Sequence, residues 1–262
     1  MEFRSNATSL LLWTLVITVL IAATMSLYEV FLENNTKILA MMSILPEGTL
    51  QFKGISNVDD LFSVLGFYSA NNVVYMLVLG SIYAMVLSSG ILLKEEYHKT
   101  AEFLLVWPLT RNEVFFSKAS VAYLNIFIIN LITTGAGYLT LEIFKKEPYS
   151  VNAFLILSFS TLLLHIFFVS LGLFMSVLVK KPRPITTLGI GLVLIFYFIY
   201  TISNITESIS WIGYISPYKF LSLDVLNPGY RIESLNLLYF LGLSFILVFA
   251  SYRLYRCKNI YL

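Results

Sequence analysis

Six stretches of this chain contain no Asp, Glu, Lys or Arg, and each is long enough to cross a membrane. The hydrocarbon core of a bilayer is about 30 Å thick, so a spanning helix needs about 20 apolar residues. Backbone polar groups in lipid must be satisfied internally, which favours helices, and the alternation typical of a membrane β-barrel is absent. The stretches are residues 5–28, 61–93, 119–141, 148–179, 184–206 and 234–252.

Composition supports an integral membrane protein. Hydrophobic residues make up 58% of the chain and charged residues 12%, whereas charged residues are about 25% of an average soluble domain. The net charge of +2 is small, and no basic patch carries interleaved aromatics, so nucleic acid is not an expected partner. We therefore predict an all-α fold in a single transmembrane domain, with spans at about residues 8–28, 66–92, 114–141, 151–179, 185–204 and 234–254.

The distribution of basic residues predicts the orientation. An even number of spans puts both termini on one side, and that side holds more of the 17 Lys and Arg residues. The bias places both termini in the cytoplasm of a plasma membrane, although Lys145 and Lys146 fall outside and oppose the rule. The outer loops are then residues 29–65 and 205–233, and the second carries three aromatics expected at the membrane interface, Trp211, Tyr214 and Tyr218.

The charge-rich segment between the second and third stretches is the most informative part of the chain. Placed on a helix, its apolar and charged residues fall on opposite faces, which predicts an amphipathic helix lying in the membrane plane over about residues 93–107. Pro108 must end this helix. Thr110 and Glu113 then have the spacing of a capping box that starts the next span at Val114. A solvated loop that only maintains the topology is the alternative.

The same segment resembles the permease subunits of ABC-2 type transporters. That family has an acidic pair, Thr-x-Glu, Leu-Leu, Pro, a turn with Arg, and a Lys in the third helix, and its usual Gly before the Thr is Lys99 here. A Leu-Pro-Glu element at residues 45–47 and a Ser-Pro-Tyr element at 216–218 also agree. The matching residues are Glu95, Glu96, Thr100, Glu102, Leu104, Leu105, Pro108, Arg111 and Lys118.

The resemblance implies a coupling helix that docks on a separate ABC ATPase subunit. Glu95, Glu96 and Glu102 would contact that subunit or hold the helix in place. Three further residues, Leu104, Leu105 and Pro108, would anchor it to the spans. No glycine begins the P-loop pattern G-x-x-x-x-G-K-[ST], so we expect ATP and Mg to be bound by the partner and not by this chain. A second permease subunit, identical or related, and membrane lipids complete the expected partners of an ATP-driven exporter.

Few other residues suggest chemistry. The chain has one Cys and two His, and it lacks zinc-binding and catalytic patterns, so no metal, cofactor-binding or catalytic residue is expected. His165 lies deep in a predicted span. It is either a functional polar site or a neutral ring bonded to a neighbouring helix. Small residues at 88–90, 135–137 and 189–191 predict close helix contacts, within the subunit or at a dimer seam or hinge.

Two other functions are alternatives to transport. One is a membrane scaffold or binding protein that transports nothing. The other is an intramembrane protease, because Glu95–Glu96 is similar to the Glu-Glu-x-x-x-Arg motif of membrane-embedded prenyl-protein proteases. Thr100 occupies the Arg position of that motif, and the two histidines do not have the spacing that those enzymes need, so the protease is disfavoured.

Overall fold

The computed structural model describes residues 2–42, 58–93, 110–179, 182–205 and 207–257, and these residues form helices with no β-strand among them. Six of the described helical stretches are long and apolar enough to cross a membrane, as predicted. They run over Asn6–Glu33, Val64–Ile91, Arg111–Phe144, Val151–Leu178, Ile185–Ile205 and Ser234–Cys257.

The first part of the chain forms two spans and the helices between them. The first span is made by α1 (Glu2–Ser26) and its continuation α2 (Tyr28–Glu33), followed by α3 (Asn35–Met42). The second span is preceded by the 3-10 helix η1. In chain order the elements of this part after α3 are η1 (Val58–Phe62), α5 (Val64–Tyr68), the π turns η2 (Ser69–Val73) and η3 (Met76–Gly80), and α6 (Ser81–Ile91).

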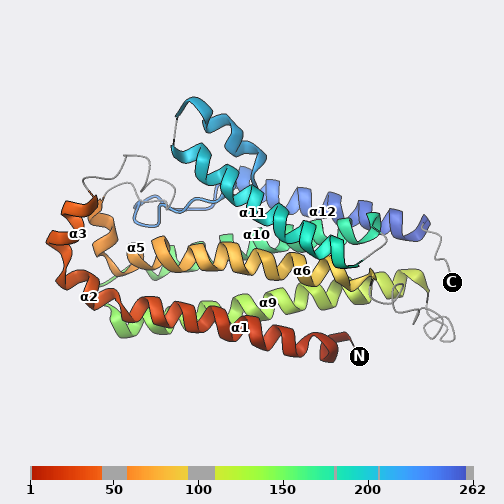
Figure 1. The fold of residues 1–262 in the computed structure, drawn as a ribbon, viewed down its shortest axis with the longest axis horizontal. Helices are drawn as coiled ribbons and strands as arrows, with labels where there is room; N and C mark the ends of the chain where they lie inside the picture. The colour runs from red at the N-terminus through yellow and green to blue at the C-terminus, as the bar shows by residue number, and fades with distance from the viewer. Residues whose placement is uncertain (1, 43–57, 94–109, 180–181, 206, 258–262) are drawn as a thin grey trace.

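The second part of the chain forms four spans. Two short 3-10 helices, η4 and η5, lie in the segment before the last span. In chain order the elements are α9 (Arg111–Phe144), α10 (Val151–Leu178), α11 (Pro182–Ile205), η4 (Glu207–Ile215), η5 (Pro217–Phe220) and α12 (Ser234–Cys257). The long helices run side by side, with the start of α1 and the end of α12 at one end of the bundle (Figure 1). We call this the inner end, after the predicted orientation, and the end that carries α3 and η4 the outer end. Residues 207–233, between α11 and α12, are called the outer segment.

Helix α10 is the centre of the bundle. It packs most extensively against α6 and α12, while α1 packs on α9 and α11 packs on α6. Lipid offers no hydrophobic driving force between helices, so close contact and hydrogen bonds hold spans together. At Gly172 the two central helices approach so closely that an added Cβ would lie 2.0 Å from Ser88 Oγ. This part of the small-residue pattern at 88–90 therefore serves packing within the subunit.

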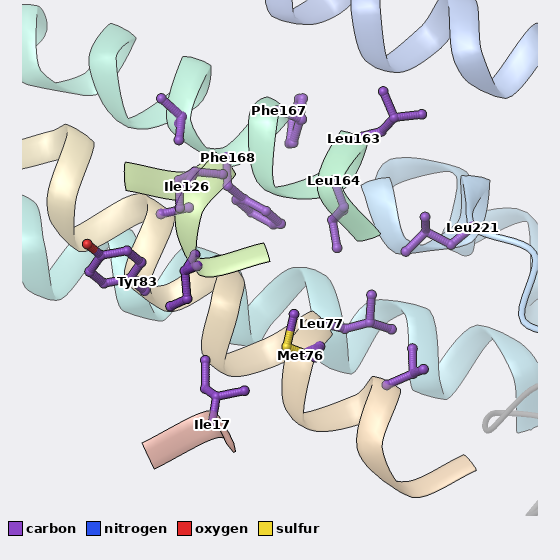
Figure 2. Close-up of a cluster of buried hydrophobic side chains, with 14 of the residues drawn as sticks. Ile17, Met76, Leu77, Tyr83, Ile126, Leu163, Leu164, Phe167, Phe168 and Leu221 are labelled. Carbon is purple, nitrogen blue, oxygen red and sulfur yellow. The ribbon is translucent and has the colours of Figure 1, made fainter. Parts of the chain in front are cut away.

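The buried core is continuous across the spans and reaches the outer segment. Figure 2 shows Leu77 of the second span, Leu164 of α10 and Leu221 of the outer segment in the same cluster of buried side chains. Hydroxyl groups within the spans bond carbonyls one turn back, as Thr14 does to Leu10 and Thr161 does to Leu157. These bonds satisfy polar groups that lipid cannot solvate.

The two basic residues that oppose the orientation rule are both ion-paired at the outer end. Lys145 Nζ lies 2.5 Å from Glu142 Oε2, and Lys146 pairs with Glu29 at the end of the first span. Each positive charge therefore has a carboxylate beside it.

Candidate functional site

The predicted coupling segment begins where α6 ends. Leu93 is fully buried, and residues 94–109 lie outside the described part of the chain. The roles of Glu95, Glu96, Lys99, Thr100, Glu102, Leu104, Leu105 and Pro108 therefore stay predictions. The residues on either side of this segment are described, and they form a set of bonds that we call the inner-end frame: Ile91, Thr110, Arg111, Asn112, Glu113, Lys118 and Tyr252.

Lys118 connects the helix before the segment to the helix after it. Its Nζ donates a 2.8 Å hydrogen bond to the carbonyl oxygen of Ile91, the last residue of α6, and the side chain is almost completely buried. The last carbonyls of a helix have no intrahelical donor and carry partial negative charge. A buried ammonium at that position satisfies both needs, and it fixes the end of α6 to the first turns of α9.

The predicted capping box is confirmed at the start of α9. Thr110 Oγ1 accepts from the backbone N–H of Glu113 at 3.3 Å, and the Thr110 N–H donates to Glu113 Oε2 at 2.7 Å. The helix consequently begins at Arg111, one residue after the cap and before the expected start at Val114. The direction in which the chain leaves the coupling segment is thus set by local hydrogen bonds.

The same helix start is bonded to the end of the last span. Arg111 Nη1 donates to the Arg256 carbonyl oxygen at 3.2 Å, and the Tyr252 hydroxyl donates to Asn112 Oδ1 at 3.2 Å. Beside these bonds the ring of Phe115 lies 5.6 Å from that of Tyr252. The inner-end frame therefore joins α6, α9 and α12 around the point where the segment leaves and rejoins the bundle.

A second polar site lies inside the bundle, around His165 of α10. The ring is fully buried, its Nδ1 lies 2.9 Å from Asn130 Nδ2 of α9, and its Nε2 lies 3.0 Å from the Met76 carbonyl oxygen. A carbonyl only accepts, so Nε2 carries the hydrogen, and in the neutral ring Nδ1 accepts from Asn130. The alternative of a ring hydrogen-bonded to neighbouring helices agrees with this geometry, which joins three spans at one residue.

The carbonyl that His165 contacts belongs to the π turn η3, and the next carbonyl is also bonded. The Tyr218 hydroxyl donates to the Leu77 carbonyl oxygen at 3.2 Å. Tyr218, which the sequence places at interface depth, has a side chain that is fully buried among the rings of Phe168, Tyr197 and Tyr200. Trp211 and Tyr214 are each 65% exposed.

Ser216 explains how Tyr218 reaches the interior. Its Oγ donates to the Phe196 carbonyl oxygen of α11 at 2.7 Å and accepts from the Tyr218 N–H at 3.3 Å. Pro217 occupies the first turn of η5, where its fixed φ and missing N–H suit a helix start. The Ser-Pro-Tyr element is therefore an anchor that inserts the outer segment into the bundle. The sequence pointed to this element, but the residues that it contacts are distant along the chain.

The remaining features of the described residues offer little chemistry. An open pocket of about 500 Å³ lies at the outer end between the first two spans and the turn before α10, with Tyr28, Phe62, Glu147 and Tyr149 in its wall. Among the described residues, no group of three His, Cys, Asp or Glu side chains could hold a metal ion.

Residues 1–259 match the family described as "ABC-2 family transporter protein". No curated protein matches the chain. The matched residues include every described span and both polar sites.

Proposed function

This chain belongs to the ABC-2 family of transporter proteins, and from that premise we propose that it is the permease subunit of an ATP-driven exporter. Membership in this family makes it a membrane subunit of a transporter that associates with an ABC ATPase. We further propose that the ATPase docks on residues 93–107, on the cytoplasmic side of the plasma membrane, and that two permease subunits form the transport path.

The observation that carries this proposal is the inner-end frame. A segment that transmits force must be joined to the spans by stiff connections, since a loose joint would absorb the movement. Lys118 bonds the end of α6, and the Thr110–Glu113 capping box and Arg111 fix the start of α9 against α12. Displacement of the segment would consequently move three spans together.

The proposed mechanism is alternating access. ATP binding draws the two ATPase subunits together, and the coupling segments follow because Glu95, Glu96 and Glu102 contact them. The inner-end frame passes this displacement to α6, α9 and α12, and the path changes the side on which it opens. The ATPase shifts this equilibrium only by its differential affinity for the two states.

Charge reversal on the coupling segment tests this proposal. We expect Glu95→Lys combined with Glu102→Lys to abolish co-purification with the ATPase and its stimulation in reconstituted membranes. The matched control is Glu147→Lys combined with Glu233→Lys, which makes the same charge change on exposed residues at the outer end. Normal assembly and ATPase stimulation in the first variant would refute the coupling role.

A scaffold protein without transport activity is the second candidate. It predicts that the ATPase binds but that ATP hydrolysis moves no material across the membrane. Reconstitution of the full complex in vesicles, with ATP-dependent loss of labelled lipids or small molecules as the readout, separates the two.

A further inference from the structure

The second span, Val64–Ile91, contains two π turns in an otherwise α-helical path, at Ser69–Val73 and Met76–Gly80. A π turn holds one more residue per turn than an α turn, is rare, and is found frequently at functional sites. It persists where the surroundings hold it in place. In a membrane the only available partners are protein groups, so the groups that contact the turn determine whether it persists.

Two buried side chains contact successive carbonyls of the second π turn, and they come from different parts of the chain. His165 Nε2 donates to Met76 O at 3.0 Å, and the Tyr218 hydroxyl donates to Leu77 O at 3.2 Å. A carbonyl has two lone pairs and can accept these bonds beside its helical one. The turn is therefore held from α10 on one side and from the outer segment on the other.

Gly80, the last residue of the turn, leaves room for the His165 contact. A Cβ on Gly80 would lie 2.4 Å from both Cε1 and Nε2 of His165. The imidazole thus occupies the space that a side chain at this position would fill, and only glycine allows the ring to reach the Met76 carbonyl in this geometry.

The outer segment also bonds the span on the outer side of the turn. Ser69 Oγ donates to the Leu223 carbonyl oxygen at 3.3 Å, and both Ser69 and Leu223 are buried. On the inner side, the close contact of Gly172 with Ser88 holds α6 against α10. The part of the span before the turn is therefore attached to the outer segment, and the part after it is attached to α10.

We infer that the Met76–Gly80 turn is a register switch in the second span, held in its π form by Tyr218 and His165. If the turn converts to α-helix, the two parts of the span must rotate by about 100° and shift by about 1.5 Å relative to each other, which is the displacement of one helical residue. Movement of the outer segment then changes the register of the span, and movement of α6 at the inner end reaches the outer segment by the same route.

This inference rests on the proposed function only for its trigger, the movement of α6 by the ATPase. The switch itself is a property of the permease chain. It is therefore tested on the full chain alone in lipid nanodiscs, where failure of the ATPase coupling has no influence on the result.

The first test is hydrogen exchange of Tyr218→Phe, which removes only the hydroxyl. Loss of one ordinary hydrogen bond corresponds to about fivefold faster opening, so we expect amides 76–82 to exchange about fivefold faster and those of α9 to keep their rate. The matched control is Tyr200→Phe, because its ring is packed 6.2 Å from that of Tyr218. Equal exchange in Tyr218→Phe and the parent chain, or an equal increase in the control, overturns the inference.

The second test detects the rotation itself. Ala70 is fully buried, and it lies in the part of the span before the turn. A Cys at position 70, in a Cys257→Ser background that removes the chain's single thiol, should react slowly with a water-soluble maleimide. We expect Tyr218→Phe to increase this rate about fivefold and Tyr200→Phe to leave it unchanged. A rate insensitive to Tyr218→Phe shows that the turn does not change register and overturns the inference.

Discussion

Lys118 Nζ donates a 2.8 Å hydrogen bond to the carbonyl oxygen of Ile91. A positive charge on the third span therefore lies against the partial negative charge at the C-terminal end of the second span. The contact is buried and lies beside the point where the coupling segment leaves the bundle. A buried carbonyl that loses its donor costs about 1–3 kcal/mol, and the cation is also favoured by the dipole of α6. This one bond is therefore both a stabilising contact and a mechanical connection.

We predict that Lys118→Met lowers the free energy of unfolding by about 1–3 kcal/mol, because the buried Ile91 carbonyl loses the Lys118 donor, and reduces stimulation of the ATPase. Thermal unfolding of the purified chain and ATP hydrolysis by the complex provide the measurements. Lys145→Met is the control, since this exposed lysine is paired only at the surface and such pairs contribute about 0–1 kcal/mol. Equal losses in the two variants would contradict the prediction.

Removal of the helix cap at Thr110 should destabilise the start of α9. We expect Thr110→Ala to cost about 1 kcal/mol, because the Glu113 N–H loses its side-chain acceptor. Thr110→Ser keeps a hydroxyl at the same position and should retain most of the stability. The free energies of unfolding of the parent chain and both variants are measured in the same detergent. A serine variant as unstable as the alanine variant would show that the cap does not act through its oxygen.

The surroundings of Gly80 and Gly90 differ, so alanine substitutions at these two positions form a prediction and its matched control. In Gly80→Ala the new Cβ would lie 2.4 Å from the His165 ring, whereas a Cβ at Gly90 meets no atom within 4 Å. Overpacking of this kind costs about 1–3 kcal/mol, while Ala in an open helical position is favourable by up to about 1 kcal/mol. We expect the unfolding temperature to fall in Gly80→Ala and to stay or rise in Gly90→Ala; a fall in both would contradict the assigned contact.

The anchor at Ser216 should be more sensitive than a neighbouring surface serine. Ser216→Ala leaves the Phe196 carbonyl without its 2.7 Å side-chain donor and should cost about 1–3 kcal/mol. Ser222 is exposed, so Ser222→Ala should change stability by no more than about 0.5 kcal/mol. Limited proteolysis of the outer segment provides the readout, with faster cleavage expected in Ser216→Ala alone.

Features encoded by neighbouring residues were predictable from the sequence. The six spans follow from runs of apolar residues long enough to cross lipid. The cap at Thr110 and Glu113 follows from a spacing of three residues, and the structure contains both of its hydrogen bonds. These features depend on residues that are close together in the sequence, so they can be predicted without knowing the fold.

Features that depend on distant contacts were not predictable. Tyr218 lies 141 residues from the Leu77 carbonyl that it contacts, and its place near Trp211 and Tyr214 in the sequence indicated only a position at the membrane interface. The partners of His165 are an amide and a carbonyl on two other spans. The π turn at Met76–Gly80 has no local sequence signature, because the side chains that hold it come from elsewhere.

The central position of α10 has a consequence for biosynthesis. Asn130 and His165 are separated by 35 residues, which a ribosome adds in about 2–7 s at 5–20 residues per second. During that interval Asn130 and the Met76 carbonyl lack the imidazole that contacts both of them in the folded chain. In a nascent chain that ends before α10, this contact therefore cannot yet join α9 to the second span.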